Sequence, residues 1–145
     1  MKVLLQRVSS AKVKIKKMDY SNIEKGVLIF LGISPDDDES DIIALTNKIL
    51  KLRIFPSDTK GMDKSLKEIN GSALVVSQFT LYGNCENGRR PSFTEAAKPE
   101  YAKKIYLHFI STLKESGLNI QHGKFGENME VKLTNSGPVT FMLES

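Results

Sequence analysis

The sequence predicts an α+β fold in which layered antiparallel or mixed β-sheets, barrel-like in form, are covered by two main helices. Segments with strand character outnumber segments with helical periodicity, and the helical segments lie between groups of strands. The chain has 145 residues, which is the length of one domain, and no linker, repeat or low-complexity segment divides it. We therefore expect a single domain over residues 1–145.

The first part of the chain is expected to form strands. Lysines alternate with Val13 and Ile15, which predicts a strand with one wet and one buried face. Those lysines fit a solvent-facing side better than an RNA contact, because edge strands often carry them. The segment 19–22 is interpreted as a turn. Strands are expected at residues 2–8, 12–16 and 26–32, the last of them central.

Two amphipathic helices are expected, at residues 38–52 and 99–116. Acidic residues suit the positive end of a helix dipole, and we prefer this explanation of the aspartates at 36–38 to a metal site. Pro99 suits the first turn of the second helix, and His108 falls outside its apolar stripe. The expected buried stripes are Ile42, Leu45, Ile49 and Leu52 in the first helix, and Tyr101, Ile105, Phe109 and Leu113 in the second.

The connecting segments are assigned from their turn residues and polarity. A loop is expected at 57–61, a turn at 70–71 and a long polar loop at 83–98. The remaining strand candidates are 53–55, 118–121, 129–133 and 139–143.

The stretch Ala73–Tyr82 is typical of a strand buried on both faces that turns polar at its end. Four apolar or small residues lead into Ser77, Gln78, Phe79 and Thr80. A buried strand that becomes polar has reached either solvent or a site, and this segment alone favours neither.

Composition says more about the cellular compartment of the protein than about its binding partners. Net charge is +4, from 21 basic and 17 acidic residues, a mild excess that suits an RNA partner without requiring one. The single cysteine, Cys85, allows no internal disulfide, which fits a reducing cytoplasm. No run of about 18 apolar residues occurs, so we expect no membrane span.

The residues argue against the common nucleophile and metal systems. Neither His108 nor His122 stands beside a motif serine or the cysteine, and no G-x-S-x-G, H-E-x-x-H or C-x-x-C occurs. No spacing of ligands suggests a catalytic zinc. What remains is a site of hydroxyls, amides and main-chain groups.

Two motifs resemble the signatures of D-aminoacyl-tRNA deacylases, the enzymes that hydrolyse D-amino acids from mischarged tRNA. They are SQFTL at 77–81 and NSGPVT at 135–140. The other stretches that resemble this family, in the same order, are LLQRVSSAKV at 4–13, GISPDDD at 32–38, Arg53–Phe55 and Arg90–Phe93. The resemblance covers essentially the whole chain, and short motifs in register are specific together.

The resemblance implies a hydrolase of carboxylic esters that needs no metal or other cofactor. Ser77, Gln78, Phe79 and Thr80 would line the pocket for the terminal adenosine and the D-amino acid. Because an aminoacyl-tRNA is an activated ester, a placed water and main-chain donors near Phe79 and Thr80 would suffice. Two mechanisms stay open: Thr80 is a covalent nucleophile, or the 2′-hydroxyl of the terminal ribose helps to activate water. No base stands beside Thr80, so we favour the second.

The resemblance also implies a homodimer. The Gly137–Pro138 bond would be cis and would enter the active site of the other subunit, where its carbonyls leave no room for an L side chain. A tight turn between strands is the commoner meaning of Gly-Pro. The same filter predicts weak rejection of glycine, and so hydrolysis of glycyl-tRNA mischarged on tRNA(Ala). The supporting residues implied are Gln6, Arg7, Val139 and Thr140, with an ion pair as the alternative role of Arg7.

The expected partner is D-aminoacyl-tRNA, and the expected role is chiral proofreading of translation in the cytoplasm. Tyr82 and Phe125 are candidates for stacking a base, with core packing preferred for Phe125. The candidate phosphate contacts are Arg89, Arg90, Lys124 and Lys132. Two rival functions are a nucleic-acid-binding protein without hydrolysis and a small-metabolite hydrolase or deaminase. Turnover of D- against L-aminoacyl-tRNA separates them.

Overall fold

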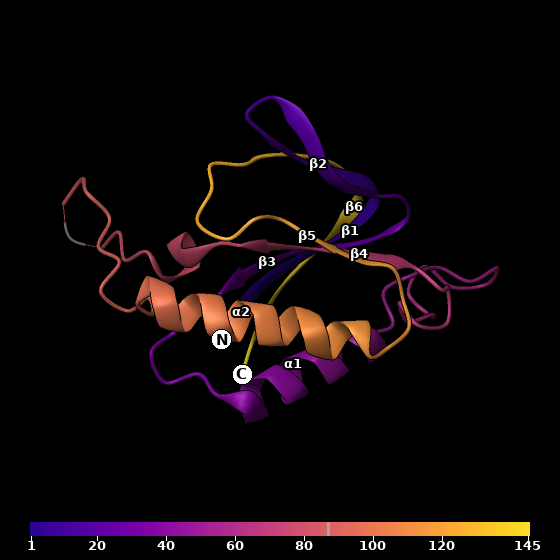
Figure 1. Cartoon of the computed structure of the whole chain (residues 1–145). Helices are drawn as coiled ribbons and strands as arrows, with labels where there is room; N and C mark the ends of the chain where they lie inside the picture. The colour runs from indigo at the N-terminus through magenta and orange to yellow at the C-terminus, as the bar shows by residue number, and fades with distance from the viewer. Residues whose placement is uncertain (87) are drawn as a thin grey trace.

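The computed structural model describes residues 1–86 and 88–145, which form a curled sheet with two helices on one face (Figure 1). The elements in chain order are β1 (Lys2–Ile15), β2 (Met18–Ile23), β3 (Gly26–Gly32), α1 (Glu39–Lys51), β4 (Ser72–Ser77), the 3₁₀ helix η1 (Phe79–Tyr82), α2 (Pro99–Lys114), β5 (Ile120–His122) and β6 (Glu130–Glu144). The expected α+β class, with a mixed barrel-like sheet and two helices, is confirmed.

The sheet is mixed because a parallel block joins an antiparallel one. Its order is β2-β1-β3-β4-β5, with β6 also paired to β1, and the β3–β4 and β4–β5 pairs are parallel. The first half of β1 lies beside β3 and its second half beside β2, while β6 follows it along most of its length. The register of β1 against β6 shifts around Val8. Such irregularities bend a strand and increase its twist, which rolls this sheet towards a barrel.

Two apolar cores lie on the two faces of the sheet. Alternate residues of β3 point to opposite sides, so Ile29 packs under the helices and Leu28 packs inside the rolled sheet. Both are fully buried, as a central strand with an uninterrupted apolar run predicts. The larger core takes the apolar stripes of α1 and α2.

Two of the three aspartates before α1 have defined partners in the structure. Asp38 is the N-cap, and its carboxylate accepts hydrogen bonds from the N–H groups of Ser40 and Asp41. In return, the N–H of Asp38 donates to the Asp41 carboxylate. Asp37 is buried and accepts from the Met1 ammonium at 2.5 Å and from the N–H of Ser34 at 2.7 Å. Helix N-terminal chemistry therefore accounts for Asp38, as expected.

Several expected elements differ in extent. The two strands expected at 2–8 and 12–16 form one continuous strand, and so do those at 129–133 and 139–143. The turn expected at 19–22 is wrong, because these residues belong to β2. Residues 53–55 form no strand; Phe55 makes only an isolated bridge to Lys64.

Smaller corrections concern element ends. The strand expected to run on from Ala73 ends at Ser77, and a 3₁₀ turn follows it. The strand expected at 118–121 is shifted to Ile120–His122. Tyr101 is 37% exposed and so is not part of the buried stripe of α2, although its hydroxyl donates to the Asp37 carbonyl at 2.5 Å. The loop at 83–98 is present, apart from Asn87, which lies outside the described residues.

No helix among the described residues has the length and apolar character to cross a membrane.

Candidate active site

The site forms where β5 stops and β4 continues. β5 pairs with β4 only as far as Val75, and after His122 the chain leaves the sheet. The N–H of Gly123 still donates to the Val75 carbonyl at 2.8 Å, and the Tyr106 hydroxyl donates to the same carbonyl at 2.9 Å. Beyond that point the edge of β4 has no strand beside it among the described residues. Its last residues face a pocket instead.

This pocket has a volume of about 660 Å³ and lies between the end of β4, the start of α2 and residues 125–131. Its walls are mostly apolar. The main apolar side chains are Phe79, Phe93, Ala97, Ala102, Phe125 and Met129. The polar groups are Ser77 and Gln78, and the ionisable ones among the described lining residues are Lys98 and Glu127. Apolar walls with a few polar groups are typical of a small-molecule site.

Three of the four motif residues, Ser77, Gln78 and Phe79, line this pocket, whereas Thr80 follows them in the 3₁₀ turn and is not among the lining residues. The N–H of Gln78 is held by the Leu31 carbonyl at 2.8 Å. Among the described residues, the N–H groups of Phe79 and Thr80 donate to no acceptor. They are therefore available as donors to a developing oxyanion. The Phe79 ring is 57% exposed and meets Phe93 edge-on, with ring centroids 5.0 Å apart.

The Thr80 hydroxyl has an amide as its neighbour. The Gln78 Nε2 donates to the Thr80 Oγ1. A carboxamide cannot take up a proton at neutral pH, so this partner orients the hydroxyl without activating it as a nucleophile.

The Gly137–Pro138 peptide bond is cis, and both residues are exposed. Arg7 anchors the preceding residue: its Nε donates to the Ser136 carbonyl at 2.8 Å, and its guanidinium also donates to the Ile54 carbonyl. The register shift near Val8 leaves a bulge in β6 around Gly137 and Pro138. The Asn135 side chain spans this bulge, donating to the Arg7 carbonyl at 3.0 Å and the Val139 carbonyl at 3.2 Å. Arg7 therefore binds carbonyls, and its alternative role in an ion pair is not found among the described residues.

The other supporting residues lie on the same patch of β1 and β6. Gln6 donates to the Thr140 hydroxyl at 3.1 Å, and Val139 is buried in the main core. The structure thus brings Gln6, Arg7, Val139 and Thr140 together around the Gly137–Pro138 bulge.

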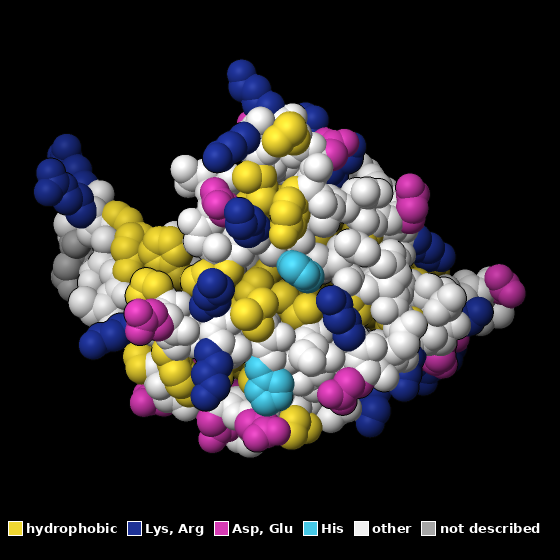
Figure 2. Space-filling view, viewed as in Figure 1, with side chains coloured by type: hydrophobic (Ala, Val, Ile, Leu, Met, Phe, Trp, Pro, Cys, Tyr) yellow, Lys and Arg dark blue, Asp and Glu magenta, His cyan; other side chains and the backbone are white. Residues whose placement is uncertain are grey.

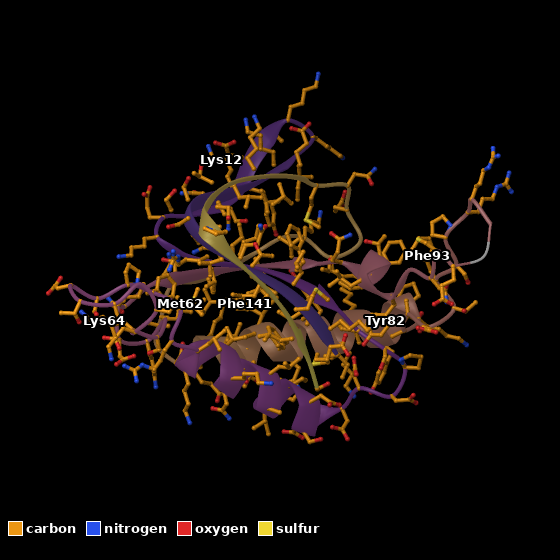
Figure 3. All side chains as sticks on the ribbon, turned by 180° about the vertical axis from the view of Figure 1, so that it is seen from behind. Lys12, Met62, Lys64, Tyr82, Phe93 and Phe141 are labelled. Carbon is orange, nitrogen blue, oxygen red and sulfur yellow. The ribbon has the colours of Figure 1, made fainter. Side chains whose placement is uncertain are left out.

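Within one chain this bulge does not meet the pocket. Ser77 pairs with Leu31, Leu31 with Val3, and Val3 with Leu143, so Ser77 lies three strands across from Leu143. Gly137 lies six residues further along β6. With about 4.8 Å between strands and about 3.3 Å per residue, the two motifs are roughly 24 Å apart when measured along the sheet. Figure 3 agrees, because Phe93 beside the pocket and Met62 beside the Arg7-bound Gly61 lie at opposite ends of the molecule.

The expected stacking residues differ from each other. Tyr82 is buried, with the Lys2 ammonium 4.9 Å from its ring centroid, and burial raises its pKa to about 12. Tyr82 is also absent from the pocket wall, so its burial leaves little of its ring free to stack a base. Phe125 packs against Tyr106 and also lines the pocket.

Sequence reasoning missed several wall residues. Ala97, Ala102, Met129 and Glu127 come from three segments far from the motif in sequence, and no local pattern marks them. Glu127 pairs with Lys124 at 3.0 Å, and this hydrogen bond lowers the pKa of the Glu127 carboxyl.

Comparison with known proteins places the chain in a class and then in a family. A family model described as "D-Tyr-tRNA(Tyr) deacylase" matches residues 4–144, so the class is that of tRNA deacylases. The chain belongs to the D-aminoacyl-tRNA deacylase family. It is 51% identical over 146 residues to the "D-aminoacyl-tRNA deacylase" of Petrotoga mobilis and 48% identical over 145 residues to that of Thermotoga petrophila. In both cases 100% of this chain and 97% of the relative are covered.

Solved structures share the fold. A "c-Myc DNA Unwinding Element Binding Protein" superposes with a TM-score of 0.92 at 37% identity, covering 100% of this chain and 99% of the other. A "probable eukaryotic D-amino acid tRNA deacylase" superposes with a TM-score of 0.85 at 20% identity, covering 99% and 98% of the two chains. At that identity the second likeness concerns the fold alone.

Proposed function

We propose that this chain hydrolyses the ester of D-aminoacyl-tRNA, releasing the D-amino acid and tRNA. Family membership supports the reaction. The observation that carries it is the turn that begins at Phe79, which lines an apolar pocket, and continues to Thr80: the main-chain N–H groups of both residues have no acceptor among the described residues. Such donors stabilise the oxyanion of acyl transfer. One domain over residues 1–145 performs this task, and we expect it to act in the cytoplasm.

The water-activating group belongs to the substrate in this proposal. Ser77, Gln78, Phe79 and Thr80 hold the terminal adenosine and the amino acid, and the 2′-hydroxyl of the ribose assists the attacking water. Thr80 has no base beside it, since its partner is the Gln78 amide. The protein supplies placement and N–H donors, which suits a substrate that is already an activated ester.

Gly137 and Pro138 act as a chirality filter in the pocket of a second copy. Both are exposed and lie roughly 24 Å along the sheet from the pocket of their own chain by strand spacing, so a second molecule is needed to unite them with a site. Their carbonyls exclude an L side chain by a fixed clash. Glycine has no side chain to clash, so glycyl-tRNA mischarged on tRNA(Ala) is also hydrolysed.

In the homodimer that this proposal requires, the bulge of each copy must keep its shape inside the pocket of the other. Arg7 and Asn135 hold its carbonyls, and Gln6 and Thr140 fix the strands beside it. This prearrangement supports a rigid filter, because a loose one would yield to an L side chain. Arg89, Arg90, Lys124 and Lys132 remain candidate phosphate contacts, and all four are exposed.

One assay tests the proposed function. D-tyrosyl-tRNA and D-aspartyl-tRNA are compared with their L forms and with glycyl-tRNA, with and without EDTA. We expect turnover of the D forms and glycyl-tRNA, little turnover of the L forms, and no effect of EDTA. Failure to hydrolyse any D-aminoacyl-tRNA would refute the proposal.

A second candidate function is favoured by the name of one structural neighbour, the DNA-unwinding-element binding protein. It is binding of nucleic acid without hydrolysis. Salt-sensitive binding of uncharged RNA or DNA, with no turnover in the assay above, would favour it.

A further inference from the structure

A second hollow lies beside the pocket. This hollow has a volume of about 300 Å³ and shares Glu127 and Met129 with the pocket wall. Its opposite side is the tip of the β1–β2 hairpin, with Lys14, Lys16 and Lys17. Figure 1 shows the same arrangement, because the segment before β6 passes between the hairpin and the end of β4. The two hollows therefore share a wall at Glu127 and Met129, and the hairpin tip lines the other side of the second hollow.

The charge at this tip is only partly neutralised, because Glu127 and Glu130 line the same hollow as Lys14, Lys16 and Lys17. Asp19 pairs with Lys12 at 2.9 Å and Lys14 at 3.3 Å, so these two lysines are occupied. Lys16 and Lys17 are exposed, and neither forms an ion pair with another described residue. Figure 2 shows Lys and Arg side chains gathered over this hairpin. The nearby carboxylate of Glu127 is itself paired with Lys124 at 3.0 Å.

The backbone gives a second, independent observation. Ile15 pairs with Met18, so Lys16 and Lys17 form a two-residue hairpin loop. Their φ angles are 51° and 66°. Such a turn favours Asn followed by Gly, because a side chain with φ above zero is strained. Two adjacent lysines at these positions cost stability, and local chemistry offers no reason for them. Strained residues of this kind concentrate at functional sites.

We propose that Lys16 and Lys17 bind phosphates of the tRNA strand that leads its 3′ end into the pocket. This inference rests on the proposed function. If the pocket holds the terminal adenosine, the preceding nucleotides must leave it along a surface that accepts negative charge. The second hollow shares Met129 with the pocket and is lined by Lys16 and Lys17. Their ammonium groups form no ion pair with the described residues and are suitable phosphate contacts. Ammonium contacts to phosphates are independent of sequence, so these two lysines would position the strand without selecting one tRNA.

The test compares two substrates and two variants. The substrates are D-tyrosyl-tRNA and 3′-O-D-tyrosyladenosine, which has the ester but no RNA strand. The variant is Lys16→Gln/Lys17→Gln, and the matched control is Lys25→Gln/Lys114→Gln, which removes the same charge from exposed positions outside both hollows. For tRNA at about 0.1 M salt, we expect KM to rise roughly tenfold with kcat unchanged. The slope of log(kcat/KM) against log[salt] becomes shallower by about 1.4. The adenosine ester is turned over as by the parent chain.

A second variant separates charge from folding. Lys16→Asn/Lys17→Gly installs the residues that the turn prefers, so we expect a higher melting temperature together with the same loss on tRNA. The inference is overturned if either hairpin variant keeps the parent KM for tRNA, if the control variant loses as much, or if the adenosine ester is affected equally. A parent chain that hydrolyses neither substrate would refute the proposed function instead.

Discussion

Thr80 decides between the two mechanisms at the scale of a single residue. Its hydroxyl is oriented by the Gln78 amide and has no base beside it. We therefore expect Thr80→Ala and Thr80→Val to retain turnover of D-tyrosyl-tRNA, with kcat reduced by less than about 10²-fold, the lower end of the cost of removing one oxyanion donor. The measurement is single-turnover hydrolysis with an acid quench. A trapped acyl-enzyme in the parent chain, together with complete loss in Thr80→Val, would establish the covalent route.

Gly137 tests the filter, because a side chain there has no room. A Cβ at this position would lie 2.1 Å from the Asn135 Oδ1, so Gly137→Ala displaces the amide that holds the bulge. We expect the ratio of D- to L-tyrosyl-tRNA hydrolysis to fall at least tenfold, which corresponds to about 1.4 kcal/mol of lost discrimination. Gly61→Ala is the matched control, since a Cβ there meets nothing within 4 Å. An unchanged ratio in Gly137→Ala would count against the filter.

The N-cap of α1 links stability to pH at the scale of an element. Hydrogen bonds from the Ser40 hydroxyl and from the N–H groups of Ser40 and Asp41 lower the pKa of the Asp38 carboxyl from its usual 3.8. A lowered folded-state pKa stabilises the fold above the unfolded value and loses this effect as pH falls through the folded value. Asn caps a helix without titrating. We expect the difference in unfolding free energy between the parent and Asp38→Asn to be larger at pH 7 than near pH 3, measured by urea titration. A difference that does not change with pH would contradict this assignment.

Elements with strong local signals could be predicted from sequence. β3 matches its expected bounds because its apolar run is uninterrupted, and α1 begins one residue after its expected start at Asp38. β2 was missed because Asp19, Ser21 and Asn22 have turn character, and only pairing with β1 makes them a strand. β1 and β6 were each divided in two because Ser9 and Gly137 look like breaks, whereas in the sheet they belong to bulged regions.

The candidate site was predicted only in part, for a similar reason. The motif at Ser77–Thr80 is contiguous, so the sequence displays it. The pocket wall is assembled from α2 and from residues 125–131, which meet the motif only through the fold. The relation of the Gly137 bulge to the pocket lies beyond one chain.

At the scale of the whole molecule, mixing two variants tests whether the filter of one chain acts on the pocket of another. Gln78→Ala impairs the pocket and leaves the bulge intact, while Gly137→Ala does the reverse. If the filter acts in trans, an excess of Gln78→Ala protein mixed with Gly137→Ala protein forms mixed dimers in which an intact pocket receives an intact bulge. We expect hydrolysis of L-tyrosyl-tRNA to be suppressed while hydrolysis of the D form continues. The double variant Gln78→Ala/Gly137→Ala is the control and suppresses nothing. If neither Gln78→Ala nor the double variant suppresses hydrolysis of L-tyrosyl-tRNA, the filter acts on the pocket of its own chain.

The early end of β5 has a consequence for how this fold can diversify. The opening beside Val76 and Ser77 exists because a neighbour stops at His122, so its width is set by the length of one strand and not by a moving lid. Adding or removing a residue pair at that end would narrow or widen the entrance while leaving the cores beneath it untouched. Such a change would also have to keep Phe125 and Met129 in place, because these two residues follow β5, line the pocket and pack against the two cores.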